Sequence, residues 1–328
     1  MDMSEIRKCL DLLEQLTPKP RPGRSSMTAV DLFAGWGGFS LGAEQAGAEV
    51  LWAANHNPLA VAAHAKNLPT AQHLCQDLEQ ANFYDTPDHD LLLAAPACQG
   101  HSQASQPRRR SYHDRLRATA WAVVSAVEAK RPEVLVVENV PDFLRWKLFR
   151  VWHEALTELG YNLTQYQLTA SHFGVPQRRK RVFIVGVRGQ HALPLRFIKR
   201  PEPGFRSCID ESAGGWRRVC DSTEGVMRRV AKGRGNHGDE FLSQWVTGHP
   251  GVSLDEPIRT ITGAVNHWNL VRGDEYRPLT TRELARGMGF PESYEFPQAT
   301  KKELTLGLGN AVCPPVAREI VSQVLACA

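Results

Sequence analysis

The chain has 328 residues, of which 42% are hydrophobic and 23% charged, and its 39 basic and 35 acidic side chains give a formal net charge of +4. This composition is typical of a globular protein and excludes an intrinsically disordered chain, a collagen-like repeat and a disulfide-stapled miniprotein. At about 150 residues per domain, the length suggests two domains. No window reaches the roughly 18 apolar residues that span a bilayer, and the charged N-terminus is unlike a secretory signal. We therefore expect a cytoplasmic protein with no membrane partner.

The seven cysteines include no CxxC pair, so the sequence suggests neither a zinc knuckle nor a disulfide framework, and we expect no metal site. The excess of four positive charges is a weak indication of an anionic partner, because ordinary soluble enzymes show a similar excess.

The chain begins with an extension that differs from the rest. Apolar side chains recur at helical spacing over residues 4–16, and TPKPRPGRSS then breaks regular structure, so we expect residues 1–26 to be an appended helix and a linker. From residue 27 short apolar runs alternate with helical stretches. The predicted strands are TAVDLF at 28–33, EVLWAA at 49–54, QHLC at 72–75, DLLLAAP at 90–96, EVLVVE at 133–138 and RVFIVGV at 181–187, and the predicted helices are 39–47, 58–67, 117–130 and 143–159. This alternation predicts an α/β fold with a doubly wound, mostly parallel sheet.

Residues 189–272 break the alternation and are rich in Gly, Pro and Arg. Between residues 196 and 234 ten basic residues stand against five acidic ones, and no long amphipathic helix is expected before about residue 280. We interpret 189–272 as a smaller, irregular substrate domain, although scattered surface charges would give the same pattern. Helical periodicity returns at 280–290 and 314–326, so 273–328 are expected to rejoin 27–188 in one domain.

Polar residues follow each predicted strand, at the edge where open α/β sheets bind ligands. The first strand leads into DLFAGWGGFSLG, whose Gly35, Gly37 and Gly38 permit a tight turn and a close backbone approach to a ligand. The second ends in Asn55-His56-Asn57 without a carboxylate, which argues against a nicotinamide dinucleotide. Asp77, after the third, can accept a hydrogen bond from an exocyclic amine.

Cys98 follows the fourth strand in the polar loop APACQGHSQAS, and arginines at 108–110 follow it closely. Polar surroundings and nearby cations lower a thiol pKa, so a nucleophile is favoured over an inert core cysteine. Glu138 ends the fifth strand, where partial burial would raise its pKa and suit it to donate a proton. The alternative for Glu138 is a helix-capping Glu-Asn pair. In QRRKR, alternation sends Arg179 and Arg181 to one face, which suits a phosphate or a planar base.

These motifs together resemble the cytosine-C5 DNA methyltransferase family, in family order over 28–188 and 276–325. DLFAGWGGFSLG resembles its S-adenosylmethionine loop, PACQGHS its nucleophile loop, ENV at 138–140 its glutamate motif and QRRKR its QxRxR motif. RPLTTRELARGMGFP at 277–291 and GNAVCPPVA at 309–317 resemble its two closing motifs. The resemblance implies the S-adenosylmethionine-dependent methyltransferase fold, with S-adenosylhomocysteine as product and 189–272 as the target-recognition domain.

The resemblance also implies roles for individual residues. Cys98 would add as a thiolate to C6 of the target cytosine, Glu138 would protonate N3, and Arg179 and Arg181 would hold the ring. The target base must be flipped out of the duplex for this chemistry. The implied cofactor residues are Phe33, Gly35, Trp36, Gly37, Asn55, His56, Asp77, Pro96, Asn310 and Val312. The expected DNA contacts are Gln99, Ser102, Arg108, Arg109, Arg110, Arg217, Arg218, Arg228 and Arg229.

The chain departs from the family pattern at two positions. Ala97 stands where the family usually has Pro before the nucleophile, and Asn55 stands where an acidic residue commonly binds the ribose hydroxyls. An amide can pair with hydroxyls but without charge assistance, so His56 or Asn57 can share that role.

The favoured hypothesis is a monomeric bacterial or phage modification enzyme that methylates cytosine in a specific duplex DNA sequence, with a cognate restriction endonuclease as an optional partner that acts separately. Methylation of cytosine in tRNA is the alternative within the same chemistry. A non-catalytic DNA-binding regulator on the same fold is a third hypothesis, against which the presence of both Cys98 and Glu138 argues. An oxidoreductase is the weakest, because the strand-two carboxylate is missing.

Overall fold

The computed structural model describes residues 26–97, 110–189, 191–246 and 248–327, with the backbone alone for 110–118. The helix predicted at 4–16 lies outside these residues. None of the helices in the described part of the chain combines the length and the apolar character needed to cross a bilayer.

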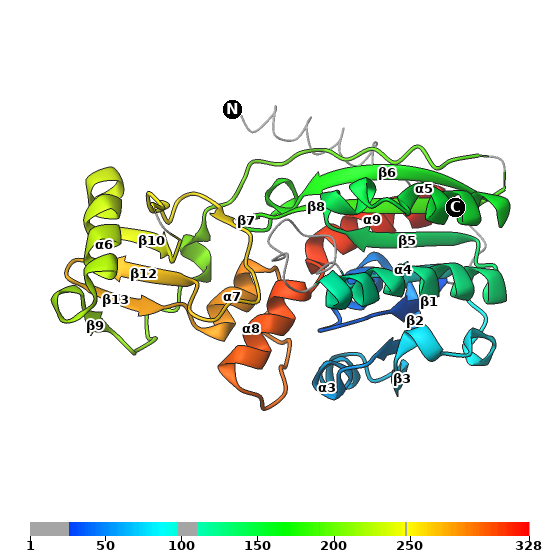
Figure 1. Cartoon of the computed structure of the whole chain (residues 1–328), viewed down its shortest axis with the longest axis horizontal. Coiled ribbons are helices and arrows are strands. Elements are labelled where there is room, and N and C mark those ends of the chain that lie inside the picture. Colours follow the sequence, from blue (N-terminus) through cyan, green and yellow to red (C-terminus); the bar gives the residue numbers. More distant parts are fainter. Residues whose placement is uncertain (1–25, 98–109, 190, 247, 328) are drawn as a thin grey trace, which may run out of the picture.

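The larger part of the molecule is built on a seven-stranded sheet in the order β3-β2-β1-β4-β5-β8-β6 (Figure 1). Its strands are β1 (Thr28–Leu32), β2 (Glu49–Asn55), β3 (Gln72–Cys75), β4 (Leu91–Ala94), β5 (Val134–Asn139), β6 (Tyr161–Thr169) and β8 (Lys180–Arg188). Strands β1 to β5 are parallel to one another, and β8 runs antiparallel to both β5 and β6. The predicted doubly wound, mostly parallel sheet is therefore confirmed.

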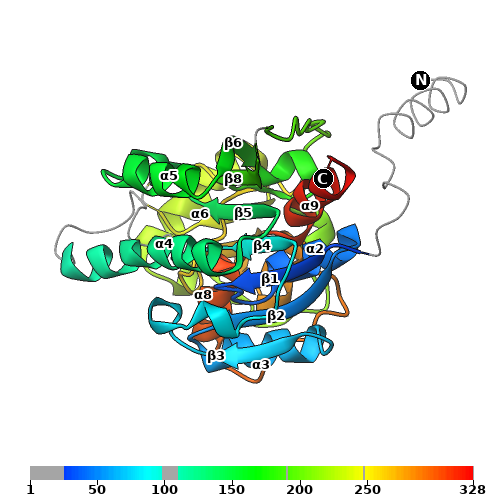
Figure 2. The same ribbon diagram turned by 90° about the vertical axis from the view of Figure 1, so that its right-hand side faces the viewer.

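Helices cover both faces of this sheet (Figure 2). On one face lie α2 (Gly38–Ala46), α3 (Pro58–Asn67) and α9 (Pro314–Cys327), and on the other α4 (Arg110–Lys130) and α5 (Phe149–Glu158). Side chains alternate across a strand, so each strand supplies both cores. In β1, Ala29 packs with Phe39 and Ile320 on the first face, whereas Val30 packs with Val123 and Trp152 on the second. The sheet is thereby held between two apolar layers.

The smaller part contains an antiparallel sheet in the order β10-β12-β13-β9, at the left of Figure 1. Its strands are β9 (Arg217–Arg218), β10 (Glu240–Gln244), β12 (Trp268–Arg272) and β13 (Glu275–Pro278), and α6 (Glu224–His237) packs on them. This region is more regular than the sequence indicated, since α6 is a 14-residue helix where none was expected. The boundary expected at residue 272 falls inside the β12–β13 hairpin, so the small sheet continues to Pro278.

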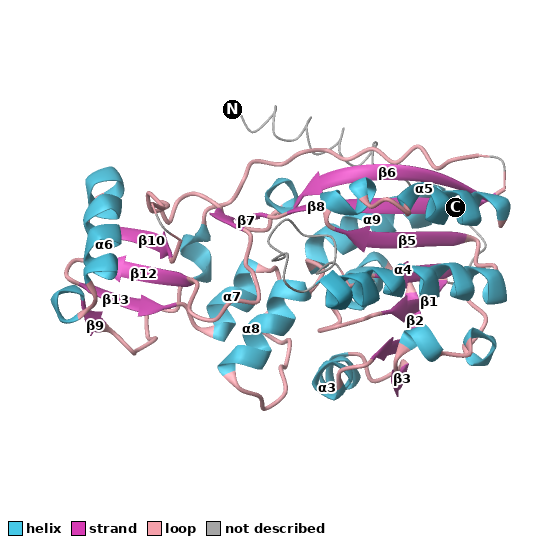
Figure 3. Cartoon of the chain, viewed as in Figure 1, coloured by secondary structure: helices cyan, strands magenta, loops and turns pink. Residues whose placement is uncertain are grey.

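Four further elements lie between the two parts. β7 (Gln177–Arg178) pairs in parallel with β11 (Ile258–Arg259), and α7 (Thr281–Gly287) and α8 (Lys301–Asn310) follow the small sheet. Residues 191–204, by contrast, form no helix or strand and run as a loop over the larger part (Figure 3). Short 3-10 helices lie at Leu78–Gln80, Phe83–Asp85, Pro141–Arg145, Ala170–Phe173, Phe205–Cys208 and Val219–Asp221.

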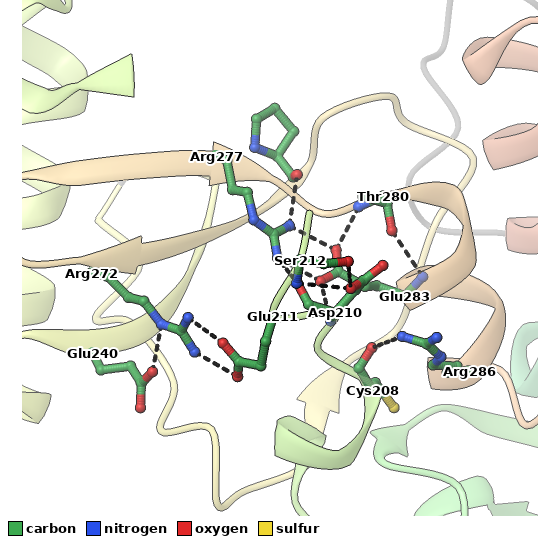
Figure 4. Close-up of polar contacts among 11 residues, drawn as sticks. Cys208, Asp210, Glu211, Ser212, Glu240, Arg272, Arg277, Thr280, Glu283 and Arg286 are labelled. Carbon is green, nitrogen blue, oxygen red and sulfur yellow. Dashed lines mark hydrogen bonds and ion pairs between the residues drawn. The ribbon is translucent and has the colours of Figure 1, made fainter. Parts of the chain in front are cut away.

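A buried ion pair fixes the junction between β13 and α7 (Figure 4). Arg277 contacts the Glu283 carboxylate at 2.7 Å, and both side chains are almost completely buried. Glu283 also accepts from the backbone N–H of Thr280 in a capping box and from the N–H of Asp210. Because a buried charge is costly without partners, this set of bonds holds the 208–212 segment firmly to the start of α7.

Candidate active site

The glycine-rich turn between β1 and α2 has an unusual backbone. Phe33, Gly35 and Gly37 all have positive φ, at 61°, 53° and 72°, a conformation that glycine adopts at little cost. The next residue, Gly38, touches the backbone of a distant segment, because an added Cβ would lie 2.0 Å from the carbonyl oxygen of Val312. The fold thus brings two of the predicted cofactor elements, the turn and Val312, into direct contact.

The other predicted cofactor residues lie around this turn. Asn55, Asp77 and Pro96 stand at or just beyond the carboxyl ends of β2, β3 and β4. Asn55 is buried and its Oδ1 accepts from the N–H of Asn57 at 2.9 Å, whereas Asp77 is exposed and caps a 3-10 helix through the N–H of Glu79. The neighbouring His56 is exposed, as is Asn310 at the end of α8.

Trp36 is buried within the fold. Its indole packs edge-on to Phe296 at 6.0 Å between ring centroids, and it lies so close to Gly307 that no Cβ fits there. Its carbonyl oxygen accepts a hydrogen bond from Tyr294 Oη at 2.5 Å. The Trp36 side chain is therefore part of the core that supports the turn.

Glu138 lies at the end of β5, in a small and largely apolar cavity. Its Oε1 is 3.0 Å from Nε of Arg181 on the adjacent strand β8. The cavity is lined by Glu138, Leu168, Ala170, Arg179, Arg181, Phe183, Val312, Cys313 and Val316. Burial raises the pKa of Glu138 above its ordinary value, and the positive charges of Arg181 and Arg179 oppose this shift without cancelling it. The group therefore keeps its proton to a higher pH than a surface glutamate does, which suits a proton donor.

Arg179 and Arg181 both line this cavity, as alternation predicts, but their contacts differ. The buried guanidinium of Arg179 donates to the carbonyl oxygens of Ile261, Gly309 and Ala311 at 3.3, 2.9 and 3.0 Å. Arg179 thus connects the QRRKR motif to two segments that are more than 80 residues away in the sequence.

Gln177 acts beside Arg179 in the same way. Its Nε2 donates to the carbonyl of Gly287 at 3.0 Å, and its Oε1 accepts from the N–H of Ile261 at 2.7 Å. Gln177 was not among the predicted site residues, although its spacing of two residues from Arg179 places it on the same inward face. The intervening Arg178 and Lys180 are exposed.

The predicted nucleophile, Cys98, lies outside the described residues, together with Gln99, Ser102, Arg108 and Arg109. The residues that lead into this segment are well fixed. The carbonyl of Pro96 accepts from Asn139 Nδ2 at 3.2 Å, and the N–H of Ala97 donates to Oγ1 of Thr119 in α4 at 3.1 Å. The chain therefore enters the segment that carries Cys98 just after Pro96, and Pro96 is bonded to Asn139, the residue that follows Glu138.

Comparison with known proteins identifies this arrangement. Residues 27–212 and 217–326 match the family described as C-5 cytosine-specific DNA methylase. The chain belongs to this family. The Type II methyltransferase M.NlaX of Neisseria lactamica is 30% identical over 317 residues, covering 90% of this chain and 96% of the relative. M.HhaI of Haemophilus parahaemolyticus, also a Type II methyltransferase, is 27% identical over 304 residues, covering 86% and 89% of the two chains.

Solved structures share the fold. Dnmt2 methyltransferase of S. pombe superimposes with a TM-score of 0.66 at 21% identity, covering 92% of this chain and 98% of that one. The methyltransferase EhMeth of Entamoeba histolytica gives a TM-score of 0.67 at 14% identity, over 92% and 98% of the two chains. The family resemblance inferred from the motifs is confirmed, and the chain is a DNA (cytosine-5-)-methyltransferase.

Five of the predicted DNA contacts of this methyltransferase lie within the described residues. Four of them are on the smaller part of the molecule, and the fifth, Arg110, is at the start of α4. Arg217 and Arg218 are exposed on β9, at the edge of the small sheet. Arg228 is exposed on α6. Arg229, one position further, stacks its guanidinium 5.1 Å from the ring centroid of Trp245. The two α6 arginines therefore have different surroundings.

The described residues contain no cluster of three or more His, Cys, Asp or Glu side chains able to hold a metal ion. Two further residues, Cys313 and Asp31, were not predicted as site residues. Cys313 lies in the Glu138 cavity, and Asp31 is completely buried in β1. The sequence did contain one indication of Asp31, because it is the only acidic residue within an otherwise apolar predicted strand.

Proposed function

We propose that this chain transfers a methyl group from S-adenosylmethionine to C5 of a flipped-out cytosine in a specific duplex DNA sequence, through a covalent bond between the Cys98 thiolate and C6. The observation that carries the proposal is the buried Glu138 carboxyl, bonded to Arg181, next to the start of the Cys98 segment. In the proposed mechanism Glu138 supplies the proton and Cys98 the nucleophile to the same ring.

The chemistry explains why both groups are needed. C5 of cytosine is not nucleophilic until addition at C6 interrupts the conjugation of the ring, and the thiolate provides that addition. Glu138, in its acid form, donates a proton to N3 so that electron density reaches C5. After methylation the C5 proton leaves and the thiolate is eliminated, which regenerates Cys98. Arg181 orients Glu138. Arg179 and Arg181 line the cavity wall, and we propose that they face the cytosine ring from there.

A stacked cytosine cannot expose both faces of its ring to a thiolate and a methyl donor. We therefore propose that the base is flipped out, which costs a few kcal/mol. The smaller domain is the proposed reader of the DNA sequence, because it presents the exposed arginines of β9 and α6.

The turn after β1 fits the cofactor. Its three left-handed residues turn the backbone sharply at the start of α2, and Oδ1 of the nearby Asp31 is buried without a hydrogen-bond partner in the described part of the chain. Phe33, Gly35, Gly37, Asn55, Asp77, Asn310 and Val312 would hold the cofactor, with His56 and Pro96 beside them. When bound, S-adenosylmethionine supplies an electrophilic methyl group on a sulfonium.

The biological setting is also a proposal. Relatives that match over most of their length are Type II methyltransferases, so we infer a cytoplasmic modification enzyme of a restriction system. We propose that it acts as a monomer, separately from any cognate endonuclease.

Expression in a strain that lacks DNA methylation, followed by bisulfite sequencing of the host DNA, tests the proposal. We expect 5-methylcytosine in one defined sequence context. Unmodified DNA from cells that contain the folded protein would contradict the proposal, and methylated tRNA in the same cells would favour the RNA alternative.

A further inference from the structure

A chain of hydrogen bonds lies beneath the glycine-rich turn, separate from the Glu138 cavity. Asp31 in β1 is fully buried, and Oγ of Ser40 in α2 donates to its Oδ2 at 2.6 Å. Nε2 of His64 in α3 lies 2.9 Å from Ser40 Oγ, and Nδ1 of His64 lies 2.8 Å from Nε2 of His73 in β3. His73 is partly exposed, so the chain runs from a buried carboxylate to the surface.

The hydrogen bonds all point toward Asp31. Ser40 has one hydroxyl proton and gives it to Asp31, so His64 must donate its Nε2–H to Ser40. Burial, with a smaller contribution from His73, lowers the pKa of His64 to about 3. His64 is therefore neutral, its Nδ1 is an acceptor, and His73 donates Nε2–H to it. An orientation of this kind suits an ionised carboxylate at its end.

The network touches the turn directly. A Cβ added to Gly37 would lie 2.6 Å from Tyr294 Oη and 3.1 Å from Cδ2 of His64. Tyr294 in turn donates to the carbonyl of Trp36. Residues of the proposed cofactor turn thus rest on the same side chains that surround Asp31.

No cation faces Asp31 among the described residues. Its neighbours in the sheet are Ala53 of β2 and Leu93 of β4. The polar groups nearby are Ser40 from α2 and Tyr294 from the 290–296 segment, with His64 and His73 behind Ser40. Burial raises the pKa of Asp31 to about 7, against the hydrogen bonds from Ser40. The carboxylate therefore lacks a counter-charge and exchanges its proton near neutral pH.

We propose that Asp31 is a specificity-determining residue for the cofactor, whose buried negative charge favours the cationic sulfonium of S-adenosylmethionine over the neutral thioether of S-adenosylhomocysteine. The Ser40–His64–His73 chain delivers the proton that removes this preference. The inference rests on the proposed function, because it takes the turn after β1 to be the cofactor site.

The proton transfer balances along the chain. One proton from solvent adds to Nδ1 of His73, whose Nε2 proton passes to Nδ1 of His64. The Nε2 proton of His64 passes to Ser40 Oγ, and the hydroxyl proton of Ser40 passes to Oδ2 of Asp31. Both histidines end neutral with exchanged tautomers, and the only net change is that Asp31 loses its charge.

Calorimetric binding of the two ligands to the full-length protein at pH 6 and pH 8 tests the selectivity. In the wild type we expect the ratio of the dissociation constants, S-adenosylhomocysteine over S-adenosylmethionine, to be several-fold higher at pH 8, where Asp31 is mostly ionised, than at pH 6, where it is mostly protonated. In Asp31→Asn the part of this pH dependence that comes from the carboxylate should be lost, so that the ratio changes with pH clearly less than in the wild type. Comparison with this variant cancels any titration of the ligands themselves.

Asp90→Asn is the matched control. Asp90 accepts hydrogen bonds from Thr28 at the opposite end of β1, so this variant should keep the pH dependence of the wild type. A wild-type ratio that does not change with pH, or an unchanged dependence in Asp31→Asn, would overturn the role of Asp31 while leaving the proposed function intact. If neither S-adenosylmethionine nor S-adenosylhomocysteine binds at pH 6 or at pH 8, the proposed function and this inference are both overturned.

Nitrogen-15 spectra of the histidines in the wild-type protein test the relay without any substitution. We expect His64 to stay neutral and to change from the Nε2–H tautomer at pH 8 to the Nδ1–H tautomer at pH 6. Retention of the Nε2–H tautomer at both pH values, or formation of an imidazolium, would refute the relay.

Discussion

Glu138 and Arg181 face each other across the β5–β8 strand pair, with Oε1 and Nε 3.0 Å apart and only 7% and 13% of their side chains exposed. The ion pair fixes the orientation of the carboxyl, and burial still keeps the pKa of Glu138 above its ordinary value. The carboxyl is therefore oriented and able to carry a proton, which are the two properties that protonation of N3 requires.

Glu138→Gln should reduce kcat by about 10²- to 10⁴-fold, the range for loss of a general acid. Glutamine retains an acceptor for Arg181 but cannot donate an acidic proton. Because the pKa of Glu138 is raised, the wild-type rate should fall as pH rises through that value, and the residual rate of the variant should lack this alkaline fall. Methylation rates from pH 5 to 9 check this, and a variant with the wild-type rate and profile would exclude Glu138 as the acid.

Arg179→Ala should destabilise the fold by about 3 kcal/mol or more, because it removes a charged donor from three carbonyl groups. Arg178→Ala is the adjacent control. Arg178 is exposed and contacts Glu202, so its loss should cost at most about 1 kcal/mol. Urea unfolding of both variants measures the difference, and equal losses would show that Arg179 does not hold these segments.

Two glycines in α6 should respond in opposite directions to alanine. A Cβ at Gly233 would lie 2.1 Å from the Phe241 ring, whereas a Cβ at Gly235 meets nothing within 4 Å. Gly235→Ala should raise stability by about 1 kcal/mol through helix propensity, and Gly233→Ala should lower it. Thermal melts compare them, and a stabilising Gly233→Ala would mean that α6 does not pack on β10 as described.

The sequence predicted most of the large sheet but not all of its elements. β1 to β5 were found because they are apolar runs next to helical periodicity. β6 was not predicted, since this edge strand alternates polar residues such as Asn162 and Gln165 with few apolar ones. The first part of the helix predicted at 143–159 instead lies in a 3-10 helix, and α5 begins at Phe149.

α8 was missed for a reason that lies in tertiary packing. Its sequence LTLGLGN contains two glycines, which disfavour a helix locally. Gly307 gives room to the indole of Trp36, and Gly309 approaches the backbone of Thr262 and Gly263. Likewise, the motifs indicated that Arg179 faces inward, but its partners Ile261, Gly309 and Ala311 come from remote segments and only the fold brings them there.

Replacing Arg217 and Arg218 by glutamine should weaken DNA binding and flatten its salt dependence by about one unit per lost phosphate contact, without changing the methylated sequence. Both arginines are exposed on β9, where adjacent side chains point to opposite faces. The control changes Arg196 and Lys199, two exposed cations on the 191–204 loop, where the Arg196 backbone N–H donates to Oε1 of Gln323 in α9. Affinity measured against salt concentration separates the pairs, and equal behaviour would exclude β9 as a DNA contact.

Covalent trapping detects the proposed bond between Cys98 and cytosine itself. Duplex DNA with 5-fluorocytosine at the target position blocks the last step, because fluorine cannot leave as a proton does. With S-adenosylmethionine, the wild type should form an adduct that survives denaturation and maps to Cys98 by mass spectrometry, and Cys98→Ala should form none. Cys313 is the control thiol: it lines the Glu138 cavity, but burial raises its pKa to about 11, so Cys313→Ala should still form the adduct. An adduct on Cys313, or one formed by Cys98→Ala, would contradict the mechanism.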